Sequence, residues 1–216
     1  MNLKEFTYAH PHALYFFDLD ETLFKTEAKV DIYDKSTNRV LGRYGSKEWN
    51  LMTFDPVSMK ADSREFQCAE IFATTSKPIR STLEAVGNLL ATDPYHTTVV
   101  ILTARWGFHD MPRFDAYMKD HGVENYLFEA VGELDIFADL VPISVRKAEC
   151  VRKYLDTCQY DHVTLIDDSV KNLSEFGLLA GQYPEVRFTA WKVEDEESHL
   201  YLDANGFQRP ANTNWF

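Results

Sequence analysis

The chain has 216 residues, of which 45% are hydrophobic and 26% charged, a composition that argues against global disorder and against a fibrous protein. Its 22 basic and 34 acidic residues give a formal net charge of −12, which disfavours nucleic acid and anionic membranes as partners, although a local basic patch would reverse this argument for nucleic acid. The three cysteines lack metal-site spacing and therefore suggest no disulfide framework or zinc finger. The N-terminal apolar run 13–17 is shorter than the ~20 residues of a membrane span. We therefore expect a cytoplasmic protein without a membrane partner.

Strands and helices are predicted to alternate along most of the chain. Apolar runs predict strands at 13–17, 97–102, 162–166 and 186–191, and a helical period is present at 79–91, 111–121, 145–156 and 170–179. Strands that are apolar on both faces belong in parallel sheets. We therefore predict an α/β fold, a doubly wound (Rossmann-like) parallel sheet with helices on both faces and a small cap or flap insertion. In such sheets ligands bind at the carboxyl ends of strands, where the strand order reverses.

The stretch 25–77 departs from this alternation. It is too long for an ordinary connection and contains a hairpin-like segment with Ser36, Thr37 and Asn38 at its turn. We interpret it as a small cap or flap inserted into a core domain of residues 1–24 and 78–193, with a plain surface excursion as the alternative. Residues 194–216 are expected to form a C-terminal extension that is either poorly structured or docked at the sheet edge.

Two pairs of carboxylates follow predicted strands. Asp18 and Asp20 follow the first strand, where an extended backbone would aim both side chains to one side of the sheet, and Asp167 and Asp168 follow the strand at 162–166. Four carboxylates at neighbouring strand ends would repel one another strongly without a cation, and hard cations such as Mg²⁺ take oxygen ligands. The pattern therefore predicts a metal site, although each acid taken singly is equally compatible with a helix cap or a first-turn acid.

Polar and cationic residues stand at matching positions. Thr103 directly follows the strand at 97–102, and Lys147 lies at the start of the helix that precedes the second acidic pair. A metal ion and a phosphate group together would balance the charges of this set.

Four motifs, taken in order, resemble those of the haloacid dehalogenase superfamily of phosphatases. They are FFDLDETLF, VVILTAR, Lys147 within SVRKAEC, and VTLIDDSVKN. The segments FATTSKPI and LTARWGFHD also resemble phage-encoded members of that superfamily. The order and spacing of four separate motifs are much more specific than any one of them.

The resemblance implies a role for each matching position. Asp18 would be the nucleophile that forms an aspartyl-phosphate, and Asp20 would act first as acid and then as base. Thr103 and Lys147 would bind the phosphate. The ligands of Mg²⁺ would be Asp18, Asp20 through its backbone carbonyl, Asp167 and Asp168.

Other residues near these motifs have two interpretations each. Arg105 would bind a second phosphate or the body of the substrate, or else form a surface salt bridge. Asn172 would orient the second acidic pair, or else be an exposed helix residue. Four aromatic residues are either core or a stacking surface for a nucleobase, with core the better supported. They are Trp49, Phe54, Trp106 and Phe108.

The activity that the resemblance implies is Mg²⁺-dependent hydrolysis of phosphomonoesters, with a small phosphorylated metabolite or a nucleotide as substrate. A polynucleotide end (3′-) phosphatase would use the same chemistry but is opposed by the net charge of −12. A non-catalytic module that sequesters a phosphorylated ligand is opposed by the intact pair Asp18 and Asp20. Dehalogenation is the weaker interpretation, because the dehalogenase members lack a carboxylate at the position of Asp20.

Overall fold

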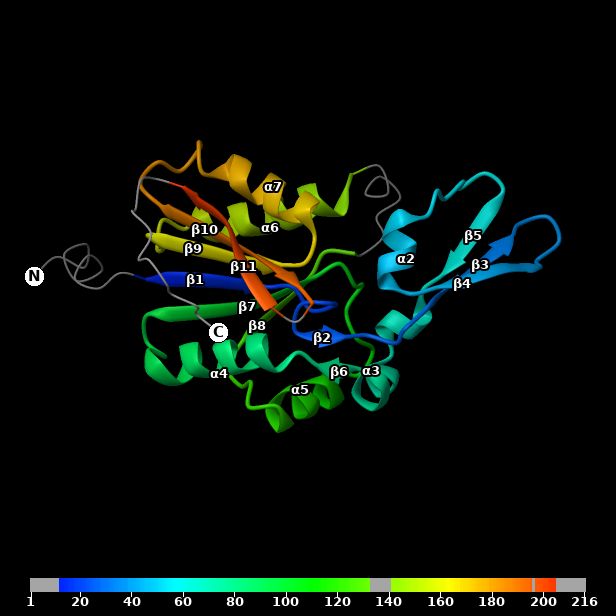
Figure 1. Ribbon diagram of the computed structural model, residues 1–216, viewed down its shortest axis with the longest axis horizontal. Helices are drawn as coiled ribbons and strands as arrows, with labels where there is room; N and C mark the ends of the chain where they lie inside the picture. The colour runs from blue at the N-terminus through cyan, green and yellow to red at the C-terminus, as the bar shows by residue number, and fades with distance from the viewer. Residues whose placement is uncertain (1–11, 133–140, 196, 205–216) are drawn as a thin grey trace, which may run out of the picture.

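The computed structural model describes residues 12–132, 141–195 and 197–204, and its centre is a six-stranded sheet (Figure 1). The strands are β1 (Ala13–Phe17), β7 (Thr97–Thr103), β8 (Leu127–Ala130), β9 (His162–Asp167), β10 (Arg187–Glu194) and β11 (Glu197–Ala204). Their order in the sheet is β11-β10-β9-β1-β7-β8. All neighbours pair in parallel except β10 and β11, which are antiparallel. The fold is therefore α/β with a mostly parallel central sheet.

Strand β1 shows why both faces of the sheet are covered. Successive side chains of a strand point to opposite faces. Leu14 and Phe16 accordingly lie in one hydrophobic cluster, and Phe17 lies in another. The first cluster includes residues of α6 (Ile143–Leu155) and α7 (Val170–Leu179); the second includes residues of α3 (Ala69–Thr75), α4 (Arg80–Thr92) and α5 (Met111–Asp120) (Figure 1). Burial of one such apolar side chain contributes about 1.5–3 kcal/mol to the free energy of folding, so the two clusters stabilise β1 at the centre of the sheet.

An insertion leaves and re-enters the core beyond the carboxyl end of β1 (Figure 1). Its first and last strands, β2 (Phe24–Lys25) and β6 (Lys77–Pro78), pair with each other as antiparallel strands. Between them lie β3 (Val30–Asp34), β4 (Val40–Tyr44), α2 (Ser46–Leu51), β5 (Met59–Asp62) and the short 3₁₀ helix η1 (Arg64–Gln67). Strands β4, β3 and β5 form a separate three-stranded antiparallel sheet.

The predicted hairpin of this insertion is present as β3 and β4. At its turn, Oδ1 of Asp34 accepts hydrogen bonds from the backbone N–H groups of Ser36 and Thr37. Helix α3 also falls within 25–77, but it packs on the core, where the ring of Phe72 contacts Phe24, Phe108 and Phe114. The stretch 25–77 thus contributes both a small sheet of its own and one helix of the core.

The predicted core strands and helices are all present, with ends that differ by a few residues. Strand β8 was not predicted, because its sequence LFEA is short, is half exposed and carries a charged residue, Glu129, at the sheet edge. Beyond β10 the chain docks at the opposite edge as β11, and residues 205–216 of the expected extension lie outside the described part of the chain. No helix in the described ranges is long and apolar enough to cross a bilayer.

Candidate active site

Three strand ends bring the predicted site residues to one edge of the sheet. Asp18 follows β1, Thr103 ends β7 and Asp167 ends β9. Strand β1 lies between β7 and β9, so the chain leaves β1 on one side and later returns on the other. This reversal of strand order is where open α/β sheets usually bind ligands. The backbone of Asp18 continues the ladder, since its N–H donates to the carbonyl of Ile166 at 2.9 Å.

Lys147 joins the two acidic strand ends. Its Nζ donates to Oδ1 of Asp18 at 2.5 Å and to Oδ2 of Asp167 at 2.8 Å. All three side chains are buried. An unpaired charge in such a place is costly, so each of these groups depends on the others for its stability.

Burial is the largest single influence on the pKa of Asp18, Lys147 and Asp168, and nearby charges are the next. Burial raises the pKa of Asp18 well above its usual range, and the positive charge of Lys147 opposes the rise. Burial alone would lower the pKa of Lys147, but the carboxylates of Asp167 and Asp18 hold that pKa above its ordinary value. Burial, followed by the charge of Asp167, raises the pKa of Asp168 to about 7. Burial therefore disfavours the charged forms of Asp18 and Asp168, and one ammonium faces three carboxyl groups whose full ionisation would leave excess negative charge.

Three of the predicted metal ligands form a compact group of oxygen atoms. One carboxylate oxygen from each of Asp18, Asp167 and Asp168 lies within 4.8 Å of the other two. Hard divalent cations take this kind of ligand, and a cation here would offset the excess negative charge described above. The residues present thus fit a metal ion. The carboxylate of the fourth predicted ligand, Asp20, is not part of this group.

Asn172 fixes the orientation of Asp167. Its Nδ2 donates to Oδ1 and Oδ2 of Asp167 at 2.9 and 3.0 Å, and the backbone N–H of Ser169 donates to Oδ1 at 2.8 Å. Asn172 lies in the first turn of α7, and Ser169 caps that helix. Asn172 thus contacts one member of the second acidic pair, Asp167, and its side chain is engaged in these bonds.

Arg105 forms a buried ion pair with Asp20. Its Nε donates to Oδ2 of Asp20 at 2.8 Å and its Nη2 donates to Oδ1 at 2.5 Å. The Arg105 side chain is only 1% exposed. Neither interpretation of Arg105 from the sequence included this pairing. The salt bridge that it forms is buried and not at the surface. A phosphate could reach its guanidinium fork only if the bonds to Asp20 rearranged.

Thr103 is fully buried and turns its hydroxyl toward the following loop. Its Oγ1 accepts a hydrogen bond from the backbone N–H of Arg105 at 3.2 Å. The hydroxyl proton is not engaged in that bond, so Thr103 could donate it to a ligand oxygen at the strand ends.

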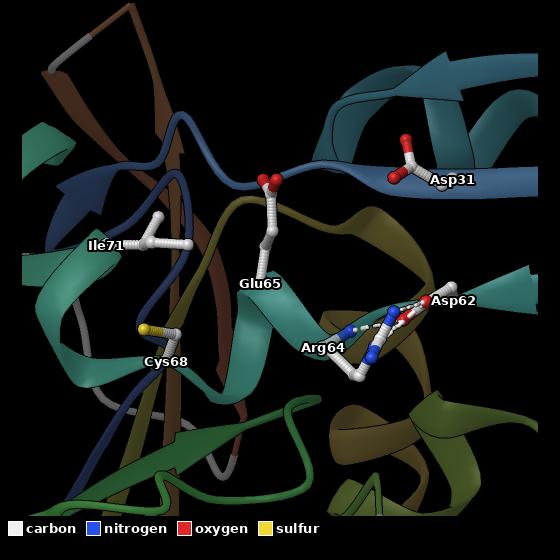
Figure 2. Close-up of a pocket in the computed structure, with 6 residues that line it drawn as sticks. All are labelled: Asp31, Asp62, Arg64, Glu65, Cys68 and Ile71. Atoms are coloured by element: carbon white, nitrogen blue, oxygen red, sulfur yellow. Dashed lines mark hydrogen bonds and ion pairs between the residues drawn. The ribbon is translucent and has the colours of Figure 1, made fainter.

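Two cavities lie where the insertion meets the core. The first has a volume of about 320 Å³. Figure 2 shows Glu65 between Cys68 and Ile71 on the side of the core and Asp31 and Asp62 on the side of the insertion. The second, of about 360 Å³, shares Asp62 and Arg64 with the first. Its other lining residues are Lys60, Ala61, Ser63, Gln67 and Trp106.

Two residues that line the second cavity are chain neighbours of Arg105 and of its partner Phe66, although Asp20 and Arg105 do not line the cavity themselves. Trp106 follows Arg105 directly in the chain, and Gln67 follows Phe66, whose carbonyl accepts a hydrogen bond from Arg105 at 2.7 Å. The indole of Trp106 is 43% exposed. Of the other aromatic candidates, Phe108 is buried and stacks on Phe114 in the core, and Trp49 and Phe54 contact each other within the insertion. Of the four aromatic candidates, Trp106 is therefore the one that lines one of these two cavities.

Comparison of the chain with protein-family models, with curated proteins and with solved structures found no match. Inference about function therefore depends on the residues of the site and their geometry. The sequence did not indicate the buried pairing of Arg105 with Asp20 or the part that Phe66 has in it. No local pattern in the sequence marked this pairing, because Asp20, Phe66 and Arg105 lie far apart in the chain.

Proposed function

We propose that this chain is a Mg²⁺-dependent phosphatase of the haloacid dehalogenase type, with a doubly wound core, that hydrolyses a small phosphomonoester. The observation that carries the proposal is the contact of one buried ammonium, Lys147, with both Asp18 and Asp167 where the strand order reverses. A structural ion pair needs one carboxylate. A cation shared by two, with a third carboxylate beside them, is typical of a site that handles an additional anion and a metal.

The first step is transfer of the phosphoryl group to Asp18. A carboxylate oxygen of Asp18 forms a bond to phosphorus while the bond from phosphorus to the ester oxygen breaks. Asp20, protonated on an oxygen that has released its bond to Arg105, gives that proton to the leaving oxygen. Lys147 and the hydroxyl of Thr103 stabilise the negative charge on the phosphoryl oxygens. In the second step Asp20 takes a proton from water, whose oxygen attacks phosphorus and releases inorganic phosphate and the free carboxylate of Asp18.

Asp18, Asp167 and Asp168 would hold the metal, together with the backbone carbonyl of Asp20. When bound, Mg²⁺ supplies positive charge that offsets the negative charge of the phosphoryl group in the transition state. Asn172 keeps the carboxylate of Asp167 in one orientation for this purpose.

A nucleotide is the first substrate class to test. The leaving group must lie beside Asp20, and Trp106, which directly follows Arg105 in the chain, lines a cavity together with Lys60. An indole can stack on a nucleobase, and an ammonium can bind a further phosphate. The same lining suits the second candidate substrate, a 3′-phosphorylated oligonucleotide.

The test is phosphate release from nucleoside monophosphates, sugar phosphates and 3′-phosphorylated oligonucleotides, in Mg²⁺ and in excess chelator. We expect release in Mg²⁺ by the wild type and none by Asp18→Asn, because an amide of nearly the same shape cannot act as the nucleophile. The matched control is Asp120→Asn, the same change at an exposed position that ends α5. Activity of Asp18→Asn at the wild-type rate, or activity unaffected by chelator, would contradict the mechanism.

A further inference from the structure

Arg105 contacts three separate segments of the chain through one guanidinium group. Besides the fork onto Asp20, its Nη1 donates to the carbonyl of Phe66 at 2.7 Å and its Nη2 donates to Oγ1 of Thr26 at 3.1 Å. Three rings surround it: the centroids of Phe66, Phe72 and Phe108 lie 4.9, 4.9 and 5.0 Å from Cζ. Such packing leaves the guanidinium little freedom to move without losing several contacts at once.

The contacted segments are the two crossings between the core and the small sheet of the insertion. Thr26 directly follows β2, where the chain leaves the core, and Phe66 lies in η1, where the chain comes back toward α3. A hydrogen bond also joins these two crossings directly, because the backbone N–H of Lys29 donates to Oε2 of Glu65 at 2.9 Å. Asp20 stands in the turn immediately before β2. The position of the insertion and the orientation of the Asp20 carboxylate therefore depend on the same side chain.

We propose that Arg105 is a positioning residue that aims the carboxylate of Asp20 at the leaving-group oxygen and couples that aim to the placement of the insertion. Its planar fork contacts both oxygens of Asp20 at once and so fixes the orientation of the carboxylate plane, which a single-point ammonium cannot do. The role at the leaving group rests on the proposed phosphatase function; the coupling between Asp20 and the crossings does not. Arg105 itself touches neither the phosphoryl group nor the metal in this scheme.

The first test compares two substrates that differ in how much they need a proton. The leaving group of an alkyl phosphate is a strongly basic alkoxide, so its departure requires a proton from Asp20. The leaving group of p-nitrophenyl phosphate is a weakly basic phenolate, so its departure depends little on protonation. General acid catalysis contributes roughly 10²–10⁴-fold, so Arg105→Lys should lower kcat/KM for the alkyl phosphate at least ~10-fold more than for p-nitrophenyl phosphate. The matched control is Arg152→Lys on the surface of α6, with equal and small effects on both substrates.

The second test is independent of turnover. Hydrogen exchange followed by mass spectrometry should show faster exchange in peptides covering 24–28 and 64–68 in both Arg105→Lys and Asp20→Asn, and unchanged exchange there in Arg152→Lys. Thr26→Val removes one acceptor of Arg105 without changing a charge, so it should give a smaller increase in the exchange rate of the same peptides. This variant keeps the test available if Arg105→Lys does not fold.

The outcomes separate the two proposals. A wild type that hydrolyses neither substrate overturns the phosphatase function and with it the role at the leaving group, while the exchange data alone then decide the coupling. An active wild type with equal losses on both substrates in Arg105→Lys overturns the positioning role and leaves the phosphatase function in place. Exchange that is unchanged in Asp20→Asn and in Thr26→Val overturns the coupling.

Discussion

Replacement of Lys147 by Met tests how far the acidic strand ends depend on one cation. The change keeps the length and most of the volume of the side chain but removes the charge that contacts Asp18 at 2.5 Å and Asp167 at 2.8 Å. Removing one partner of a buried ion pair costs about 3–5 kcal/mol, because it leaves an uncompensated buried charge. Here two buried carboxylates lose their shared partner, so we expect a loss within or above that range for the free energy of unfolding.

The assay is thermal unfolding followed by circular dichroism, in chelator so that no metal replaces the lost charge. For a chain of this length each kcal/mol shifts Tm by roughly 2–4 °C, so the expected decrease in Tm is on the order of 6–20 °C. The control is Lys153→Met, an exposed lysine of the same helix. An unchanged Tm for Lys147→Met, or an equal decrease for Lys153→Met, would refute the argument that Lys147 neutralises buried carboxylates.

The remaining predictions concern the metal and the leaving group. Asn172→Ala removes both side-chain hydrogen bonds to Asp167, and loss of such a partner of a metal ligand should weaken the affinity for Mg²⁺ by about 10–100-fold, measured by calorimetric titration; unchanged affinity would contradict the orienting role of Asn172. Trp106→Ala should raise KM for a nucleotide substrate several-fold, since base stacking contributes about 1–3 kcal/mol, and should leave KM for a small alkyl phosphate unchanged; equal effects on both would place the base elsewhere.

The layout of the core follows from patterns that act over short distances in the sequence. Continuous apolar runs predict strands buried on both faces, and β1 bears this out, with Leu14 and Phe16 in one cluster and Phe17 in the other. The polar residues after those runs then had to meet at one sheet edge, because parallel strands end on the same side. Strand β8 escaped prediction because an edge strand of four residues carries too weak a pattern.

The partners of the site residues were harder to predict. Lys147 was expected to offset the charge of the nucleophile, but its bond to Asp167 depends on how far α6 reaches over the sheet. Asp20 and Arg105 are 85 residues apart in the chain, and their pairing depends on three aromatic rings from different segments. No local pattern encodes a contact of that kind, since it requires the packed positions of η1, α3 and the loop after β7 together.

The turn after β1 explains how two carboxylates so close in sequence come to have different environments. An extended backbone would have aimed Asp18 and Asp20 to the same side, but β1 ends at Phe17, Asp20 forms only an isolated bridge with Phe24, and Glu21 has a φ of 64°. The chain bends at Leu19, between the two acids, and turns again after Asp20. Asp18 pairs with Lys147, and Asp20 pairs with Arg105. A nucleophile and an acid/base group need this separation, because one must attack phosphorus from the side of the metal while the other serves the leaving oxygen. The bend at Leu19 is thus the local feature on which the division of roles in the proposed mechanism depends.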